Sequence, residues 1–205
     1  GIQSWKEKIL PYYKIAQKML GATPSKQITH ADELLKSCAN DIGKGDTFHV
    51  NDVGVFFGKE NKTVSDPYFE GKGPERTGCT FCGGCMVGCR VGAKNTLDKN
   101  YLYLAEQLGV TIIPETKVLD VKPGKESKYE LRTKRITKLF SSLKIFHAKN
   151  VIFSGGVMGS VKLLLQCKNR GSLPNLSDQL GNFVRTNSEA LVGVKAKKKD
   201  IDYSK

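Results

Sequence analysis

The fold class is decided by the stretch Val151-Ile152-Phe153-Ser154-Gly155-Gly156-Val157-Met158-Gly159-Ser160. The apolar run at 150–154 predicts a strand, and the residues at 161–167 predict a helix. Gly155 and Gly156 permit a tight turn between them, so that backbone N–H groups at the helix start can approach a ligand closely. The full G-x-G-x-x-G spacing is absent here, so the stretch resembles half of a dinucleotide site.

Hydrophobic patterns on both sides of this stretch predict further elements. Helices are predicted over 6–20, 31–42 and 96–108, with Gly21, Gly43 and Gly109 after them. Strands are predicted over 48–50, 53–57, 110–113, 117–121, 129–132, 144–147 and 190–194. The strands between 117 and 147 form a meander. Together these elements predict a mixed fold, α/β or α+β.

The composition is that of a folded protein and excludes a disordered or fibrous chain. The chain has 205 residues, of which 39% are hydrophobic, and its formal net charge is +13. Lysines and arginines gather at 134–149 and 195–199, but no base-stacking aromatic residues are interleaved with them, so nucleic acid is not expected as a partner. The long connection at 43–78 is rich in Gly, Asp, Asn and Pro, and we expect it to cover a binding surface.

The N-terminal residues contain neither an initiator Met nor the apolar segment of a signal peptide. No apolar run approaches the roughly 20 residues that a membrane span needs. The sequence is therefore expected to be an interior fragment of a longer protein, or a trimmed chain. The expected location is cytoplasmic or peripheral to a membrane.

Four of the six cysteines form a cluster with the spacing C-x2-C-x2-C-x3-C, namely Cys79, Cys82, Cys85 and Cys89. Disulfides within so short a run would be strained. The spacing is that of bacterial ferredoxin loops, and Gly83 and Gly84 permit the turns that such loops need. However, Arg90 stands where those loops carry Pro. Three interpretations stay open: an iron–sulfur cluster, a zinc ion, or free or redox-active thiols.

Several stretches in series resemble the glucose–methanol–choline (GMC) oxidoreductases, on the cholesterol oxidase-like branch. They are Asp66-Pro67-Tyr68-Phe69, residues 88–102 from Gly88-Cys89-Arg90-Val91-Gly92-Ala93-Lys94-Asn95-Thr96, and residues 110–121, 151–165 and 171–181. The resemblance covers nearly all of the chain. It implies an FAD-dependent oxidoreductase that oxidises an alcohol CH–OH group, with a sterol as one candidate alcohol, and passes a hydride to FAD.

The resemblance also implies which residues bind the cofactor: Asn95, Thr96, Val118, Gly155 and Gly156. In the family, the residue matching Val118 contacts the adenine end of FAD through its backbone. No residue here matches the family's catalytic His and Asn, or its pyrophosphate-binding loop. The expected catalytic set in this chain is therefore empty, and the fragment alone is expected to be inactive.

The resemblance further implies a division into domains. Residues 1–78 are expected in the substrate-binding or cover region, 79–168 in the FAD-binding domain, and 169–205 at the return to the substrate domain. The expected partners are a small-molecule alcohol or sterol, the rest of the same polypeptide, and an electron acceptor that can be oxygen, a quinone or a carrier. Two rival functions are an iron–sulfur electron-transfer module and a zinc-stabilised structural or binding domain.

Overall fold

A computed structural model describes residues 4–125, 127–137, 142–185, 187, 189–193, 195, 197, 200 and 203. The described residues divide into two compact units, one within Gly1–Thr111 and Val194–Lys205, the other within Ile112–Gly193. Each unit buries apolar side chains of its own, Val55 and Ala93 in the first and Val121 and Cys167 in the second. The expected domains at 1–78, 79–168 and 169–205 stay a prediction.

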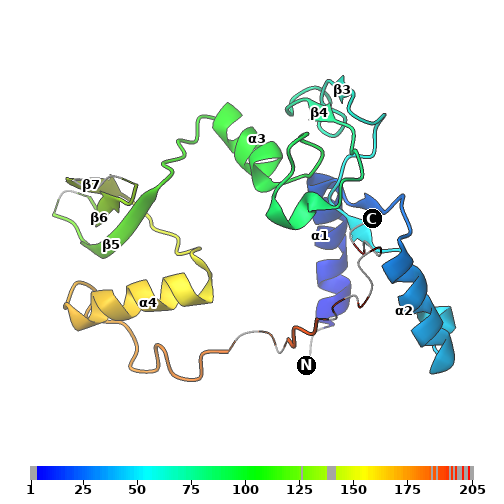
Figure 1. Cartoon of the computed structure of the whole chain (residues 1–205). Coiled ribbons are helices and arrows are strands. Elements are labelled where there is room, and N and C mark those ends of the chain that lie inside the picture. Colours follow the sequence, from blue (N-terminus) through cyan, green and yellow to red (C-terminus); the bar gives the residue numbers. More distant parts are fainter. Residues whose placement is uncertain are drawn as a thin grey trace. The chain divides into compact units, whose positions relative to one another are not determined.

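The first unit begins with two helices, α1 (Trp5–Leu20) and α2 (His30–Asp41) (Figure 1). Both confirm the predicted helices to within a residue. Gly21 ends α1 in the left-handed conformation, with φ of 57°, and its N–H donates to the Lys18 carbonyl. This is the glycine stop that the pattern predicts, because glycine adopts positive φ without a Cβ penalty.

The predicted helix at 96–108 is broken in two. Leu97–Lys99 form a 3₁₀ turn and Tyr101–Gln107 form α3. Between them lies Asn100, which is fully buried and has non-helical φ and ψ of −136° and −99°. Its side-chain oxygen accepts the N–H of Tyr101 at 2.6 Å. Asn100 therefore starts α3 as its cap, since asparagine side chains compete with the backbone for such bonds.

A reciprocal capping box starts α2. The Thr29 hydroxyl accepts the N–H of Asp32, and the Asp32 carboxylate accepts the N–H of Thr29 at 2.8 Å. These two bonds satisfy donors that would otherwise have no intrahelical partner.

Replacing Thr29 should weaken this helix start measurably. We expect Thr29→Ala to lower the free energy of unfolding by about 1 kcal/mol, because the cap hydroxyl is lost. Thr29→Ser keeps the hydroxyl and should stay near the unchanged protein. Urea unfolding of the full-length protein measures both, and equal losses for the two variants would contradict the cap.

The strands of the first unit are only two residues long. β1 (Thr23–Pro24) pairs with β2 (Asp52–Val53), and β3 (Thr63–Val64) pairs with β4 (Arg76–Thr77), both antiparallel. The predicted strand at 48–50 is wrong, because these residues are irregular. Of the predicted strand at 53–57, only Val53 lies in a ladder, and Val55 makes a single bridge to Lys94.

The loop that follows β3 is organised around one carboxylate. Asp66 accepts four backbone N–H bonds at 2.9–3.0 Å, from Tyr68, Phe69, Gly71 and Gly73. Burial raises the pKa of Asp66, but these four donors lower it more, so the pKa lies below the ordinary value. One ionised side chain thus holds eight residues of irregular chain in place.

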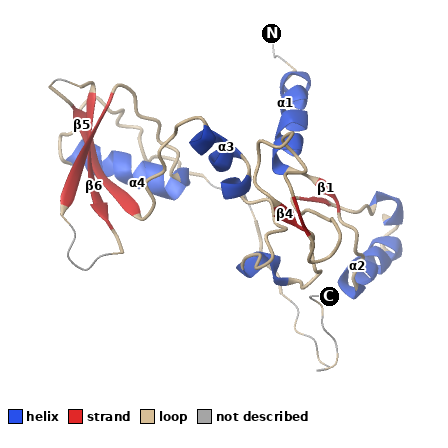
Figure 2. Cartoon of the chain, turned by 90° about the horizontal axis from the view of Figure 1, so that it is seen from above, coloured by secondary structure: helices blue, strands red, loops and turns tan. Residues whose placement is uncertain are grey.

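The second unit is a three-stranded antiparallel sheet with one helix. β5 (Thr116–Pro123), β6 (Tyr129–Arg135) and β7 (Leu143–Ala148) follow one another in the sheet, which confirms the predicted meander. The helix α4 (Gly156–Asn169) packs against β5 (Figure 2). Val121 on β5 donates its N–H to the buried Cys167 sulfur of α4 at 3.4 Å, so this contact joins sheet and helix.

Three predicted strands are wrong over the described residues. Residues 110–113, 150–154 and 190–193 are irregular, and Val194 lies outside the described part of the chain. Val110, Ile113 and Ile152 are 54%, 47% and 88% exposed. A strand forms only where a neighbour accepts its hydrogen bonds, and within the described residues none pairs with these segments. Helices and small antiparallel sheets together still confirm the mixed α/β class.

No helix among the described residues is both long enough and apolar enough to cross a membrane.

Candidate functional site

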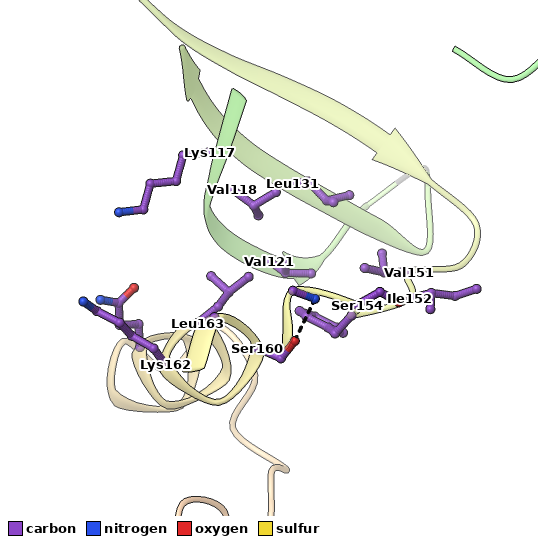
Figure 3. A pocket seen from close by; sticks show the side chains of 14 residues that line it. Lys117, Val118, Val121, Leu131, Val151, Ile152, Ser154, Ser160, Lys162 and Leu163 are labelled. Carbon is purple, nitrogen blue, oxygen red and sulfur yellow. Dashed lines mark hydrogen bonds between the residues drawn. The ribbon is translucent and has the colours of Figure 1, made fainter. Parts of the chain in front are cut away.

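A cavity of ≈ 470 Å³ opens between the sheet and the start of α4 in the second unit (Figure 3). Such a volume lies in the range of small-molecule sites. Its apolar walls come from β5, β6, the segment before α4 and α4 itself. The side chains on these walls include Val118, Val121, Leu131, Val151, Phe153 and Leu163.

The glycine turn forms one side of this cavity. Gly155 lines it, and its N–H donates to the Ser160 hydroxyl at 3.0 Å, the dashed line in Figure 3. A Cβ added at Gly155 would come no closer than 3.5 Å to Ser160, so the backbone there has room for a side chain. Gly156 is not among the lining residues and has φ of 67°. Gly156 is therefore required for the turn, whereas Gly155 keeps the cavity open.

The described residues that line the cavity carry positive charge and no carboxylate. Lys117 and Lys162 line it, and both extend to the same side in Figure 3. The N-terminus of α4 has no side-chain cap and no acidic residue in its first turn. Its first N–H groups thus lack intrahelical acceptors and add partial positive charge. The cavity therefore suits a largely apolar ligand that also bears negative charge.

β5 is the edge strand of its sheet, so among the described residues no strand pairs with the backbone groups on its outer side. A bulge shifts the register between Val118 and Asp120. The Leu119 carbonyl accepts Arg170 at 2.6 Å, and the buried Asp120 carboxylate accepts the Ser172 hydroxyl at 2.8 Å. These contacts fasten the chain after α4 to the bulge, beside Val118.

Sequence reasoning singled out none of Asp120, Arg170 and Ser172 for this role. Asp120 and Ser172 lie 52 positions apart, and no local pattern joins them. The one sequence signal for this contact is an aspartate between apolar residues of a strand, because a buried carboxylate needs a hydrogen-bond partner.

Of the predicted cofactor residues, the structure brings Val118 and Gly155 into one cavity. Asn95 and Thr96 belong to the first unit. Asn95 is buried, and its amide nitrogen donates to the Tyr68 hydroxyl at 3.1 Å, while its side-chain oxygen has no hydrogen-bond partner in the described part of the chain. Thr96 is exposed and precedes the 3₁₀ turn at Leu97–Lys99. The cofactor roles of these residues stay a prediction.

The four clustered cysteines line a different cavity, of ≈ 440 Å³, in the first unit. All four are free thiols, with Cys82 and Cys85 exposed and Cys79 and Cys89 half-buried. Within the described part of the chain, no group of three or more His, Cys, Asp or Glu side chains is placed to hold a metal ion. The predicted iron–sulfur cluster or zinc ion gains no support from that geometry.

The two half-buried thiols have opposite pKa shifts. Burial raises the pKa of Cys79, and the N–H of Phe81 only partly offsets it. Burial also raises the pKa of Cys89, but backbone N–H groups at 91–94 outweigh burial, so the net pKa is lowered. Hydrogen bonds to the charged form favour it, and Cys89 is therefore the readier thiolate of the two.

Comparison with known proteins gives consistent matches. Residues 74–171 match the family model described as GMC oxidoreductase. The chain is 46% identical over 211 residues to a cholesterol oxidase of Acinetobacter baumannii, covering 98% of this chain and 38% of that protein. A cholesterol oxidase of Mycobacterium tuberculosis is 44% identical over 207 residues, covering 98% and 36%. The chain thus spans less than two fifths of the length of these curated relatives.

Proposed function

We propose that the protein carrying this chain is an FAD-dependent oxidoreductase of alcohol CH–OH groups, because residues 74–171 match the family model described as GMC oxidoreductase. Its relatives are named as cholesterol oxidases, which supports a sterol as the alcohol. When bound, FAD accepts the hydride of the alcohol carbon. In this proposal, residues 79–168 contribute part of the FAD-binding domain, and 1–78 and 169–205 contribute parts of the substrate domain.

The observation that carries the proposal is the cavity beside Gly155. Its apolar walls suit a flat aromatic ring system such as adenine, and its lysines and uncapped helix start suit the adjoining phosphates. The outer edge of β5 offers backbone groups to a ring edge near Val118. The volume of ≈ 470 Å³ suits one end of FAD rather than the whole molecule. These residues therefore bind and orient the cofactor, and none of them moves a proton.

The sequence of this chain carries neither the family's pyrophosphate-binding loop nor its catalytic base. Its sequence contains no G-x-G-x-x-G loop, and none of its three histidines matches the family's base. His49 bonds the Thr47 carbonyl, and His147 bonds the Ser127 hydroxyl, both at exposed positions. We therefore propose that these 205 residues alone do not oxidise alcohols, because hydride transfer needs both a held flavin and a positioned base.

Cofactor analysis tests this proposal. The full-length protein should release about one FAD per chain on denaturation, identified by mass, and should oxidise a sterol. The isolated 205-residue chain with added FAD should show no turnover. A full-length protein that is purified without flavin and cannot be loaded with it would overturn the proposal. Turnover by the isolated chain would overturn the proposal that these 205 residues alone do not oxidise alcohols.

A further inference from the structure

The bulge in β5 decides which side chains of this strand line the cavity beside Gly155. Val118 and Val121 both line it, and Figure 3 shows both at its wall. In a regular strand, residues three positions apart point to opposite faces of the sheet. The bulge inserts one extra residue between the two valines, so they share a face. Their partners in β6, Thr133 and Leu131, are two positions apart and share a face as well.

The extra residue in the bulge is Leu119, which has no partner among the described residues of β6. Its carbonyl bonds outside the sheet instead and accepts the Arg170 guanidinium at 2.6 Å. Arg170 directly follows α4. A side chain from the end of the helix therefore satisfies the backbone group that the bulge removes from the ladder.

The Asp120 carboxylate is the second contact between the bulge and the end of α4. Asp120 is 5% exposed, and one of its oxygens accepts the Ser172 hydroxyl at 2.8 Å. Its other oxygen lies 3.9 Å from the Arg170 guanidinium. A buried carboxylate is costly unless hydrogen bonds and a cation compensate it. Both compensating groups come from the turn after α4, so the turn and the bulge stabilise each other.

The turn after α4 holds these two side chains in place. Gly171 has the left-handed conformation, with φ of 72°, and its N–H donates to the Lys168 carbonyl at 2.9 Å. The N–H of Ser172 donates to the Cys167 carbonyl at 2.9 Å. These two bonds form a Schellman motif, which ends a helix and turns the chain back. The motif fixes the backbone from which Arg170 and Ser172 reach β5.

The third contact comes from Cys167, in the last turn of α4, whose sulfur accepts the N–H of Val121 at 3.4 Å. Burial raises the pKa of this thiol and the Asp120 carboxylate raises it further, so the thiol stays neutral beside the carboxylate. Three consecutive residues of β5 are thus tied to the end of α4. Leu119 is held by its carbonyl, Asp120 by its carboxylate, and Val121 by its N–H.

Among the described residues that line the cavity, none takes part in these contacts from the helix end or the bulge itself, namely Leu119, Asp120, Cys167, Arg170 and Ser172. They can therefore act on a bound ligand only through the wall that the bulge places. We propose that Asp120, Arg170 and Ser172 are positioning residues for the adenine end of FAD. They hold the bulge in the shape that makes Val118 and Val121 one continuous wall. This inference rests on the proposed flavin function, because it concerns the same cavity.

A comparison of two flavins distinguishes a positioning role from a purely structural one. A contact that only stabilises the fold should, when it is lost, weaken the binding of every flavin alike. A contact that positions the adenine wall should weaken only a flavin that carries adenine. FMN has the flavin ring and one phosphate of FAD but lacks the adenosine, so it does not use that wall.

Flavin titration of the full-length protein tests the inference. The bound flavin is removed, and the protein is titrated with FAD and separately with FMN while the flavin fluorescence is followed. We expect Ser172→Ala to bind FAD about tenfold more weakly, because a hydrogen bond to a charged acceptor is lost, and to bind FMN as the unchanged protein does. Ser172→Thr keeps a hydroxyl and should restore the affinity for FAD. An equal loss for both flavins, or no loss for FAD, would overturn the inference.

Two further variants keep the test independent of the folding of Ser172→Ala. Arg170→Ala removes the exposed side chain that bonds Leu119 and should also lower the ratio of FAD affinity to FMN affinity. Ser177→Ala is the control, because this exposed hydroxyl accepts the N–H of Gln179 within its own loop, and the ratio should stay unchanged. An unchanged ratio in Arg170→Ala, or an equal fall in Ser177→Ala, would overturn the inference.

The same titrations separate this inference from the proposed function on which it rests. Unchanged full-length protein that binds neither flavin would overturn the flavin function and the inference with it. Normal FAD binding by the unchanged protein, with the same ratio of affinities in Ser172→Ala and Arg170→Ala, would overturn only the positioning role and leave the oxidoreductase proposal intact.

Discussion

Gly155→Leu should cost the full-length protein most of its bound FAD. Gly155 lines the cavity between α4 and β5, and its φ of −85° is open to any residue. A Cβ there makes only ordinary contacts, at 3.5 Å or more. The leucine side chain therefore adds no backbone strain, but it fills space that the cofactor needs. We expect a loss of about 1–3 kcal/mol of binding free energy, or roughly tenfold to hundredfold weaker binding.

Two further variants make this result specific. Val157→Leu places the same side chain on α4 at a residue that does not line the cavity, and it should keep normal flavin content. Gly156→Leu is expected to weaken FAD retention as well, but it also strains a backbone with φ of 67°, so its unfolding must be measured too. Unchanged flavin content in purified Gly155→Leu would contradict the placement of FAD in this cavity.

The second large effect concerns stability. Asp66→Ala removes the acceptor of four backbone N–H bonds, and nothing else in the loop replaces it. We expect the free energy of unfolding to fall by about 2–3 kcal/mol at neutral pH, because donors to a charged acceptor lose their partner. Glu75→Ala, at an exposed position in the same connection, should change it little. Equal losses for Asp66→Ala and Glu75→Ala in urea unfolding would contradict this account of the loop.

The same carboxylate predicts a pH dependence with a definite sign. The pKa of Asp66 is lowered in the folded protein, so its contribution is fully present above the unfolded pKa of about 4. It is lost as the pH falls through the lower folded pKa. The difference in free energy of unfolding between the unchanged protein and Asp66→Asn should therefore narrow as the pH falls from about 4 through the folded pKa of Asp66. A gap that stays constant from neutral pH to below the folded pKa would contradict the assignment.

The helices and the meander could be predicted because their signals are local. The apolar spacing of residues 6–20 and the stop at Gly21 specify α1 without reference to the rest of the chain. The alternation at 117–121 likewise predicts β5, since its partners follow directly in the sequence. Residues 150–154 have an equally apolar pattern and are nevertheless irregular. A strand of that kind depends on a distant neighbour, and a local pattern carries no information about it.

The features of the candidate sites also differ in whether the sequence predicts them. The turn at Gly155 and the cysteine cluster could be found, because glycine and cysteine carry their chemistry in their spacing. The contact of Asp120 with Ser172 could not, because it joins a bulge in a strand to the turn after a helix, 52 positions away. The distinction between Gly155, which lines the cavity, and Gly156, which only turns the backbone, also required the structure, because both occupy the same motif.

Anaerobic mixing of the full-length protein with a sterol tests whether the protein uses FAD to oxidise an alcohol. The absorbance of the bound oxidised flavin is followed after the sterol is added in the absence of any other acceptor. We expect this absorbance to bleach as the flavin takes up the hydride, with the sterol ketone formed in equal amount. Flavin absorbance that stays unchanged with sterols and with simpler alcohols alike would contradict it.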